Sequence, residues 1–98
     1  MRLKPEVKKQ IIQYAKQYFG NDIKLYLFGS RIYDNKKGGD IDIFIESMHN
    51  IDIQIQINFL RDIYRNVTER KVDLIIKTPF TKDRLIFKTA KEEGILLC

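Results

Sequence analysis

The sequence predicts a single small α/β domain spanning residues 1–98, because apolar patterns typical of helices and of strands are interspersed along the chain. Helical spacing of apolar residues occurs at the beginning, in the middle and near the end, and three short runs rich in strand formers lie among these segments. A chain of this length buries roughly 60 to 70% of its unfolded surface, so we expect one modest core and no second domain.

The first helix is expected to begin near Pro5, because proline fits the first turn of a helix. Apolar side chains then recur on one face until Gly20 interrupts the pattern. Residues 23–28, IKLYLF, predict the first strand. This strand runs directly into Gly29 and Ser30, so a turn is expected at its carboxyl end.

Strict alternation over residues 40–45 predicts the second strand. Alternation places Asp40, Asp42 and Phe44 on one face and the isoleucines on the other. We therefore expect a strand with an apolar back and an acidic front.

Residues 51–67 fit two patterns, since Ile51, Ile53, Ile55 and Ile57 alternate as in a strand while a longer apolar stripe has helical spacing. The length of the stripe, about four turns, favours a helix, with Asn50 as its N-cap.

The third strand is expected at residues 71–77, KVDLIIK, with Pro79 closing it. A last helix over residues 81–93 should end at Gly94, interpreted as a left-handed cap, before an apolar tail.

Three aspartates are candidate metal ligands. Asp40 and Asp42 lie two residues apart on a strand and thus on one face, where their oxygens can converge on Mg²⁺. Asp73 interrupts an apolar stretch, and a metal would compensate the cost of burying its charge. Alternatives stay open: an exposed edge strand for Asp40 and Asp42, and solvent exposure or pairing with a lysine for Asp73.

The turn after the first strand is a candidate phosphate site. Gly29 permits close backbone approach, the Ser30 hydroxyl can bind a phosphate oxygen, and Arg31 adds a charge-assisted donor. Neither the P-loop spacing nor GxGxxG is present, which disfavours kinase-like and dinucleotide-binding functions.

The net charge of +5 suits polyanions, but the basic residues are scattered, so a solvated basic surface is favoured over dedicated RNA binding. No apolar run has the length of about 18 residues that a membrane span needs, so a cytoplasmic protein without membrane contact is expected. The lone Cys98 and the lone His49 predict neither a disulfide nor a multi-ligand metal site.

The segments FGSRIYDNKKGGDIDIFI and KVDLII resemble the signature of the minimal nucleotidyltransferases, a family of the DNA polymerase β-like superfamily. The resemblance covers nearly the whole chain and implies an α+β fold, a small mixed sheet flanked by helices. It also implies that Gly29 and Ser30 bind nucleotide phosphate and that Asp40 and Asp42 bind metal, with Asp73 as the third acid. Gly39 departs from the family pattern, where a serine often precedes the first aspartate.

Many minimal members of this family act as antitoxins beside a helical HEPN-domain ribonuclease toxin. The resemblance therefore implies transfer of AMP from ATP to a tyrosine of such a partner, with two Mg²⁺ ions as cofactors. Two alternatives remain: a non-catalytic protein-binding antitoxin, and nucleotidyl transfer to RNA or a small molecule. Homo- and hetero-oligomers are both compatible with the sequence.

Overall fold

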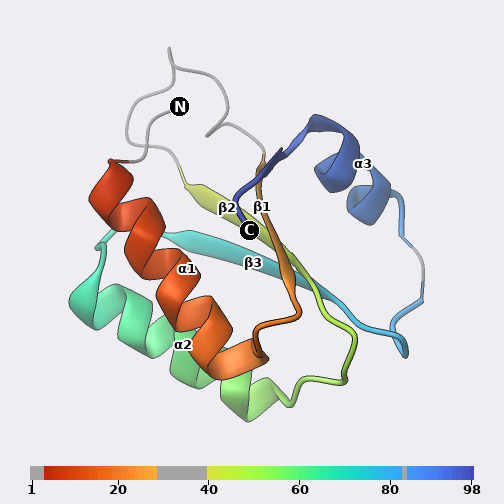
Figure 1. The fold of residues 1–98 in the computed structure, drawn as a ribbon, viewed down its shortest axis with the longest axis horizontal. Coiled ribbons are helices and arrows are strands. Elements are labelled where there is room, and N and C mark those ends of the chain that lie inside the picture. Colours follow the sequence, from red (N-terminus) through yellow and green to blue (C-terminus); the bar gives the residue numbers. More distant parts are fainter. Residues whose placement is uncertain (1–3, 29–39, 83) are drawn as a thin grey trace.

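The computed structural model describes residues 4–28, 40–82 and 84–98, and this part of the chain forms a mixed four-stranded sheet with helices on both faces (Figure 1). The sheet order is β3-β2-β1-β4, formed by β1 (Lys24–Phe28), β2 (Ile41–Glu46), β3 (Val72–Lys77) and β4 (Ile95–Leu96). β1 runs antiparallel to β2 and β4, whereas β2 and β3 are parallel. The predicted class, a small mixed sheet flanked by helices, is confirmed.

Helices α1 (Pro5–Phe19) and α2 (Ile53–Asn66) cover one face of the sheet (Figure 1). Their buried side chains Ile11, Phe59 and Ile63 belong to the same apolar cluster as the β2 isoleucines, which are buried as the alternation predicted. This cluster is the main core, and removing its apolar surface from water is the main source of stability.

Helix α3 (Leu85–Glu93) covers part of the other face. There the ring of Phe44 packs 5.6 Å, centroid to centroid, from the rings of both Tyr26 and Phe87. The face predicted as an acidic front is thus aromatic and buried in its middle, and its carboxylates lie toward the strand ends.

Tyrosine hydroxyl groups form hydrogen bonds that connect helices to each other and to the sheet. Tyr14 accepts a hydrogen bond from Asn66 of α2. The Tyr64 hydroxyl accepts one from the backbone N–H of Val72, at 2.8 Å, and thereby connects α2 to the start of β3. Tyr14 and Tyr64 are therefore held by hydrogen bonds within the fold.

Tyr18 of α1 donates a hydrogen bond to the Asp62 carboxylate of α2. This bond is the main reason why the pKa of Tyr18 is raised above 10.0 and the pKa of Asp62 is lowered below 3.8. We expect Tyr18→Phe to reduce stability at neutral pH. The difference from wild type should shrink as pH falls through the lowered Asp62 pKa, because the carboxylate is lost, and as pH rises through the raised Tyr18 pKa, because the phenol is lost. Urea unfolding of both proteins across these pH values measures the stability difference. A difference independent of pH would contradict the Tyr18–Asp62 hydrogen bond as the cause of the two pKa shifts.

Two predicted helix starts were wrong, and one strand was not predicted. α2 begins at Ile53 after Asp52, so Asn50 is not its cap. α3 begins at Leu85, because a hydroxyl-braced turn from Thr78 to Thr81 comes first. The tail after α3 was not predicted as a strand, yet it forms β4 on β1.

Gly94 is not a left-handed cap, since its φ is −81°. A Cβ atom there would lie 2.2 Å from the Ala90 carbonyl oxygen and 3.2 Å from that of Leu27. Glycine is thus required by close backbone approach at the corner between α3 and β4. We expect Gly94→Ala to lower the free energy of unfolding by about 1–3 kcal/mol in urea titrations, whereas the exposed Glu93→Ala should have little effect. Equal unfolding midpoints for the two variants would contradict this.

Candidate functional site

The register of the two parallel strands brings two of the predicted acids together. Asp42 of β2 and Asp73 of β3 are Cα partners. Neighbouring strands lie about 4.8 Å apart, and partners in register point to the same face. Asp40 precedes Asp42 by two residues and so belongs to that face as well. The structure therefore places all three predicted carboxylates at one end of the sheet, on the face that α3 partly covers.

Lys71 joins this group, although it was not among the predicted site residues. Its Nζ lies 4.0 Å from Asp40 Oδ2 and 3.7 Å from Asp73 Oδ1. Its carbonyl oxygen accepts a hydrogen bond from the N–H of Ile41 at 2.8 Å, which anchors the backbone beside β2. The alternative in which Asp73 pairs with a lysine is thus observed. A signal was present, because Lys71 precedes Asp73 by two residues and alternation puts both on one face.

The carboxylates are accessible to solvent. The side chains of Asp40 and Asp73 are 45% and 42% exposed, and that of Lys71 is 69% exposed. Such exposure weakens the ion pairs, because water screens charges at a surface. Lys71 is therefore held loosely enough to be displaced by another cation.

The donor set fits Mg²⁺, which prefers carboxylate oxygens. Within residues 4–28, 40–82 and 84–98, however, no three His, Cys, Asp or Glu side chains form a ready-made cage for a metal ion. Lys71 supplies positive charge between Asp40 and Asp73 instead. A metal at this place would require small side-chain movements of exposed groups.

The end of β1 adjoins the acidic group, since Phe28, its last residue, is the register partner of Asp42. The predicted phosphate-binding residues Gly29, Ser30 and Arg31 follow Phe28 in the chain but lie outside the described residues. Their contacts with phosphate therefore stay a prediction.

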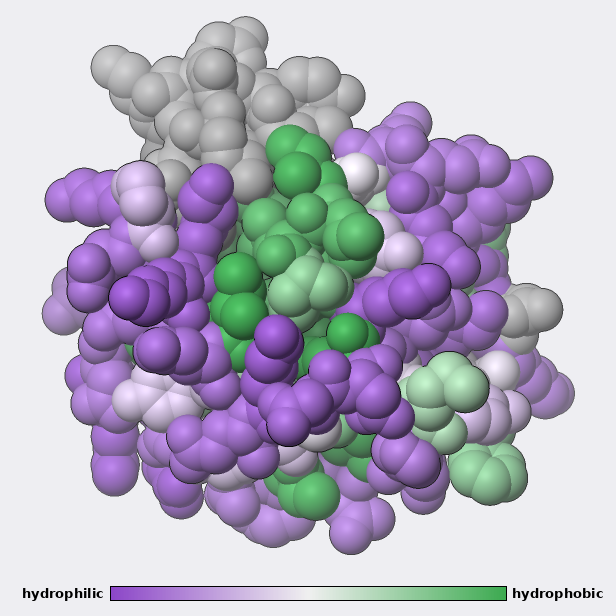
Figure 2. Space-filling model, viewed as in Figure 1, coloured by the Kyte–Doolittle hydropathy of each residue, from purple (hydrophilic) through white to green (hydrophobic). Residues whose placement is uncertain are grey.

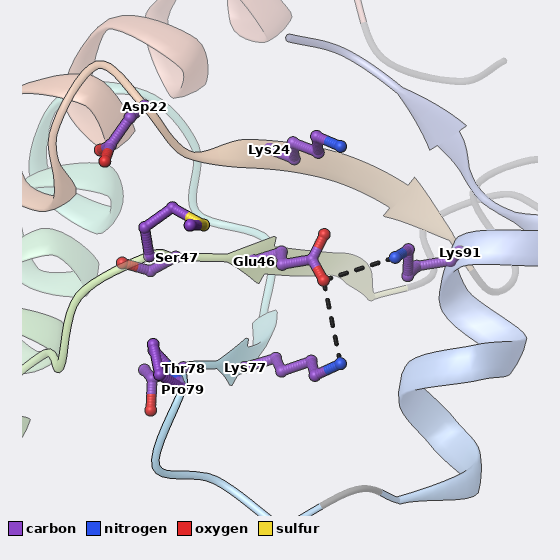
Figure 3. Close-up of a pocket in the computed structure, with 9 residues that line it drawn as sticks. Asp22, Lys24, Glu46, Ser47, Lys77, Thr78, Pro79 and Lys91 are labelled. Atoms are coloured by element: carbon purple, nitrogen blue, oxygen red, sulfur yellow. Dashed lines mark hydrogen bonds and ion pairs between the residues drawn. The ribbon is translucent and has the colours of Figure 1, made fainter.

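A pocket of about 380 Å³ opens at the opposite end of the sheet (Figure 3). Its lining includes Glu46, whose carboxylate lies 3.9 Å from Lys77 Nζ and 3.4 Å from Lys91 Nζ. Glu46 is four residues beyond Asp42, about 13 Å along β2. The pocket is thus separate from the acidic group, and sequence reasoning did not identify it.

Comparison with known protein families gives one match: the family model for the nucleotidyltransferase domain covers residues 8–97. The matched range includes the three acids, residues 29–31 and the strands of the described residues. A search among curated proteins finds no significant match. None of the helices in the described ranges combines the length and the apolar character that crossing a bilayer requires.

Proposed function

We propose that this chain, which belongs to the nucleotidyltransferase domain family of the polymerase β-like superfamily, is a magnesium-dependent adenylyltransferase that acts on a partner protein. Nucleotidyl transfer is the activity that the family supports. The observation that carries the assignment to a site is the pairing of Asp42 with Asp73, with Asp40 on the same face. Carboxylates from two adjacent strands provide the rigid support that a metal–nucleotide site needs.

Asp40 and Asp42 would hold the metal, and Asp73 would complete the ligand set. Bound Mg²⁺, proposed as two ions, would lower the pKa of the acceptor hydroxyl and neutralise the leaving pyrophosphate. Asp73 would take the proton as the acceptor oxygen attacks the α-phosphorus of ATP in line with the leaving pyrophosphate. Gly29, Ser30 and Arg31 would position the β and γ phosphates.

For the acceptor we propose a tyrosine of a HEPN-domain toxin, which modification would silence, so that this chain serves as a cytoplasmic antitoxin. The observation that supports a partner is a groove between α1 and β4, lined by apolar side chains and bordered by Lys8 and Lys9.

The apolar lining of this groove comes from Ile12, Ile95 and Leu96, and Leu96 is 55% exposed. Figure 2 shows a hydrophobic area between α1 and α3, in the middle of the view, with hydrophilic surface on both sides. The lysines favour an acidic partner over a second copy of the chain, because two copies would bring like charges together. The groove thus supports a hetero-oligomer.

A non-catalytic antitoxin is the second candidate, and the position of Lys71 is the observation in its favour. Lys71 already neutralises part of the charge of Asp40 and Asp73, so these acids have a structural role without a metal. Such a protein would act through contact alone.

Incubation with the toxin, Mg²⁺ and ATP labelled at either the α or the γ phosphate tests the proposal. We expect α label alone on the toxin, at a tyrosine located by mass spectrometry. Transfer of γ label would overturn the mechanism. A stable complex without transfer would favour the non-catalytic antitoxin, and α label on RNA or a small molecule would change the acceptor but keep the chemistry.

A further inference from the structure

Two adjoining pockets form a continuous groove on the side of the sheet away from α1 and α2. The pocket at Glu46 measures about 380 Å³, and a second one, along α3, measures about 470 Å³. They share Lys77 and Lys91 as lining residues. We call the two together the cationic groove.

Positive charge exceeds negative charge along the cationic groove. Its basic lining residues are Lys24, Lys77, Arg84, Lys88 and Lys91, and its acidic lining residues are Asp22, Glu46 and Glu92. Asp22 lies 3.1 Å from His49 Nε2 and Glu46 is held by two lysines, so two of the three acidic groups already have partners. Figure 3 shows the Glu46 carboxylate between Lys77 and Lys91, with Lys24 reaching in from the neighbouring strand. An additional anion would therefore meet a net attraction.

Three of these cations have no carboxylate partner. Among the described residues, Lys24, Arg84 and Lys88 make no ion pair, and Arg84 instead lies over the ring of Phe87, 5.6 Å from its centroid. They come from β1 and from the start of α3, so the positive charge follows the length of the groove. A line of unpaired cations suits an extended polyanion better than a single small anion.

An exposed aromatic residue directly follows lining residues of the groove in the sequence. Phe80, in the turn that follows the lining residues Thr78 and Pro79, is 79% exposed. Its backbone N–H binds the Thr78 hydroxyl, itself bound to Thr81, so the turn that carries the ring is braced. An exposed ring on a braced turn next to cations matches the stacking platforms of single-strand binding proteins.

We propose that the cationic groove binds a single-stranded nucleic acid, with its cations on the phosphates and Phe80 stacked on a base. The groove between α1 and β4 differs, because its apolar lining suits a protein. Binding at the cationic groove requires no nucleotide, no metal and none of the three aspartates, so it is independent of the proposed transfer reaction.

Fluorescence anisotropy with a labelled oligouridylate of about 12 nucleotides, and with the matching DNA, tests the proposal. EDTA in the buffer removes any contribution from a metal site. Three phosphate contacts predict a slope near −2 for the logarithm of the binding constant against that of salt concentration. Binding of both strands with this slope supports the groove, and binding of RNA alone would narrow the ligand to RNA. Absence of binding at low salt would overturn the proposal.

Two matched double variants distinguish the contribution of the groove to binding from the effect of net charge. Arg84→Gln with Lys88→Gln should weaken binding about tenfold and make the salt slope less steep. Lys16→Gln with Arg65→Gln removes the same charge from exposed positions on α1 and α2 and should change affinity less than twofold. Equal losses for the two pairs would overturn the groove as the site. Thermal melting confirms that each variant is folded.

Substitutions of Phe80 distinguish a nucleic-acid ligand from an acidic protein segment. Phe80→Leu keeps an apolar side chain but removes the stacking surface, so affinity should fall about fivefold or more, whereas Phe80→Trp should retain it. Equal affinity for wild type and Phe80→Leu, together with competition by polyglutamate at equal charge, would overturn the proposal in favour of an acidic protein segment.

Discussion

Asp42→Asn is expected to abolish nucleotidyl transfer, with a loss of about 1,000-fold or more in rate. The substitution replaces a charged metal ligand by a neutral amide, and losing several kcal/mol of transition-state stabilisation corresponds to this factor. Asparagine has nearly the same shape, and Asp42 lies within the ladder that pairs β2 with β1 and β3, so the fold should be kept. The initial rate of α-label transfer measures the effect, and circular dichroism verifies the fold.

Asp52→Asn is the matched control, because it makes the same chemical change at an exposed position before α2. We expect its transfer rate to stay within about twofold of wild type, as is usual for surface substitutions away from a site. Full activity in Asp42→Asn would remove Asp42 from the metal site. Equal loss in both variants would show that the effect comes from net charge.

Lys71→Met is expected to tighten Mg²⁺ binding about tenfold. The Lys71 ammonium lies within 4.0 Å of carboxylates on both strands, so it repels an incoming cation and competes for the same oxygens. Mg²⁺ and the Lys71 ammonium, separated by about 4 Å, would repel each other by about 2 kcal/mol in water. The net cost to Mg²⁺ binding is smaller, because the lysine side chain can move away from the ion. Isothermal titration calorimetry without nucleotide measures the affinity.

The same variant should be less stable than wild type without metal and should gain more stability when Mg²⁺ is added. Without Lys71 the carboxylates repel one another, and a bound ion stabilises the folded state by an amount that grows with the logarithm of its affinity. Lys16→Met on α1 provides the charge-matched control and should behave like wild type. If Lys71→Met and wild type bind Mg²⁺ equally, Lys71 does not compete with the metal. If neither binds Mg²⁺, the metal site itself is refuted.

The local patterns of this chain were sufficient to predict most of its elements. Pro5 and Gly20 bounded α1 correctly, because a helix start that tolerates proline and a glycine with φ of 105° are local requirements. Alternation assigned the faces of β2, since a strand has no freedom to turn a single side chain to the other face. The start of α3 was displaced by a local turn from Thr78 to Thr81, whereas β4 depends on a contact distant in sequence. β4 forms because Leu97 bonds to Leu25, and no property of a four-residue tail predicts that.

By itself, the sequence determined the residue types of the acidic group and the similarity on which the family assignment rests. A motif of glycine, serine and spaced aspartates can be recognised without the three-dimensional structure. Only the tertiary structure decided that β2 and β3 are parallel and in the register that aligns Asp42 with Asp73. A slip of one residue would have sent these carboxylates to opposite faces. The structure also placed Lys71 between the acids and gathered the cationic groove from β1, β2, β3 and α3. Such groupings arise from packing between distant segments, which no local pattern encodes.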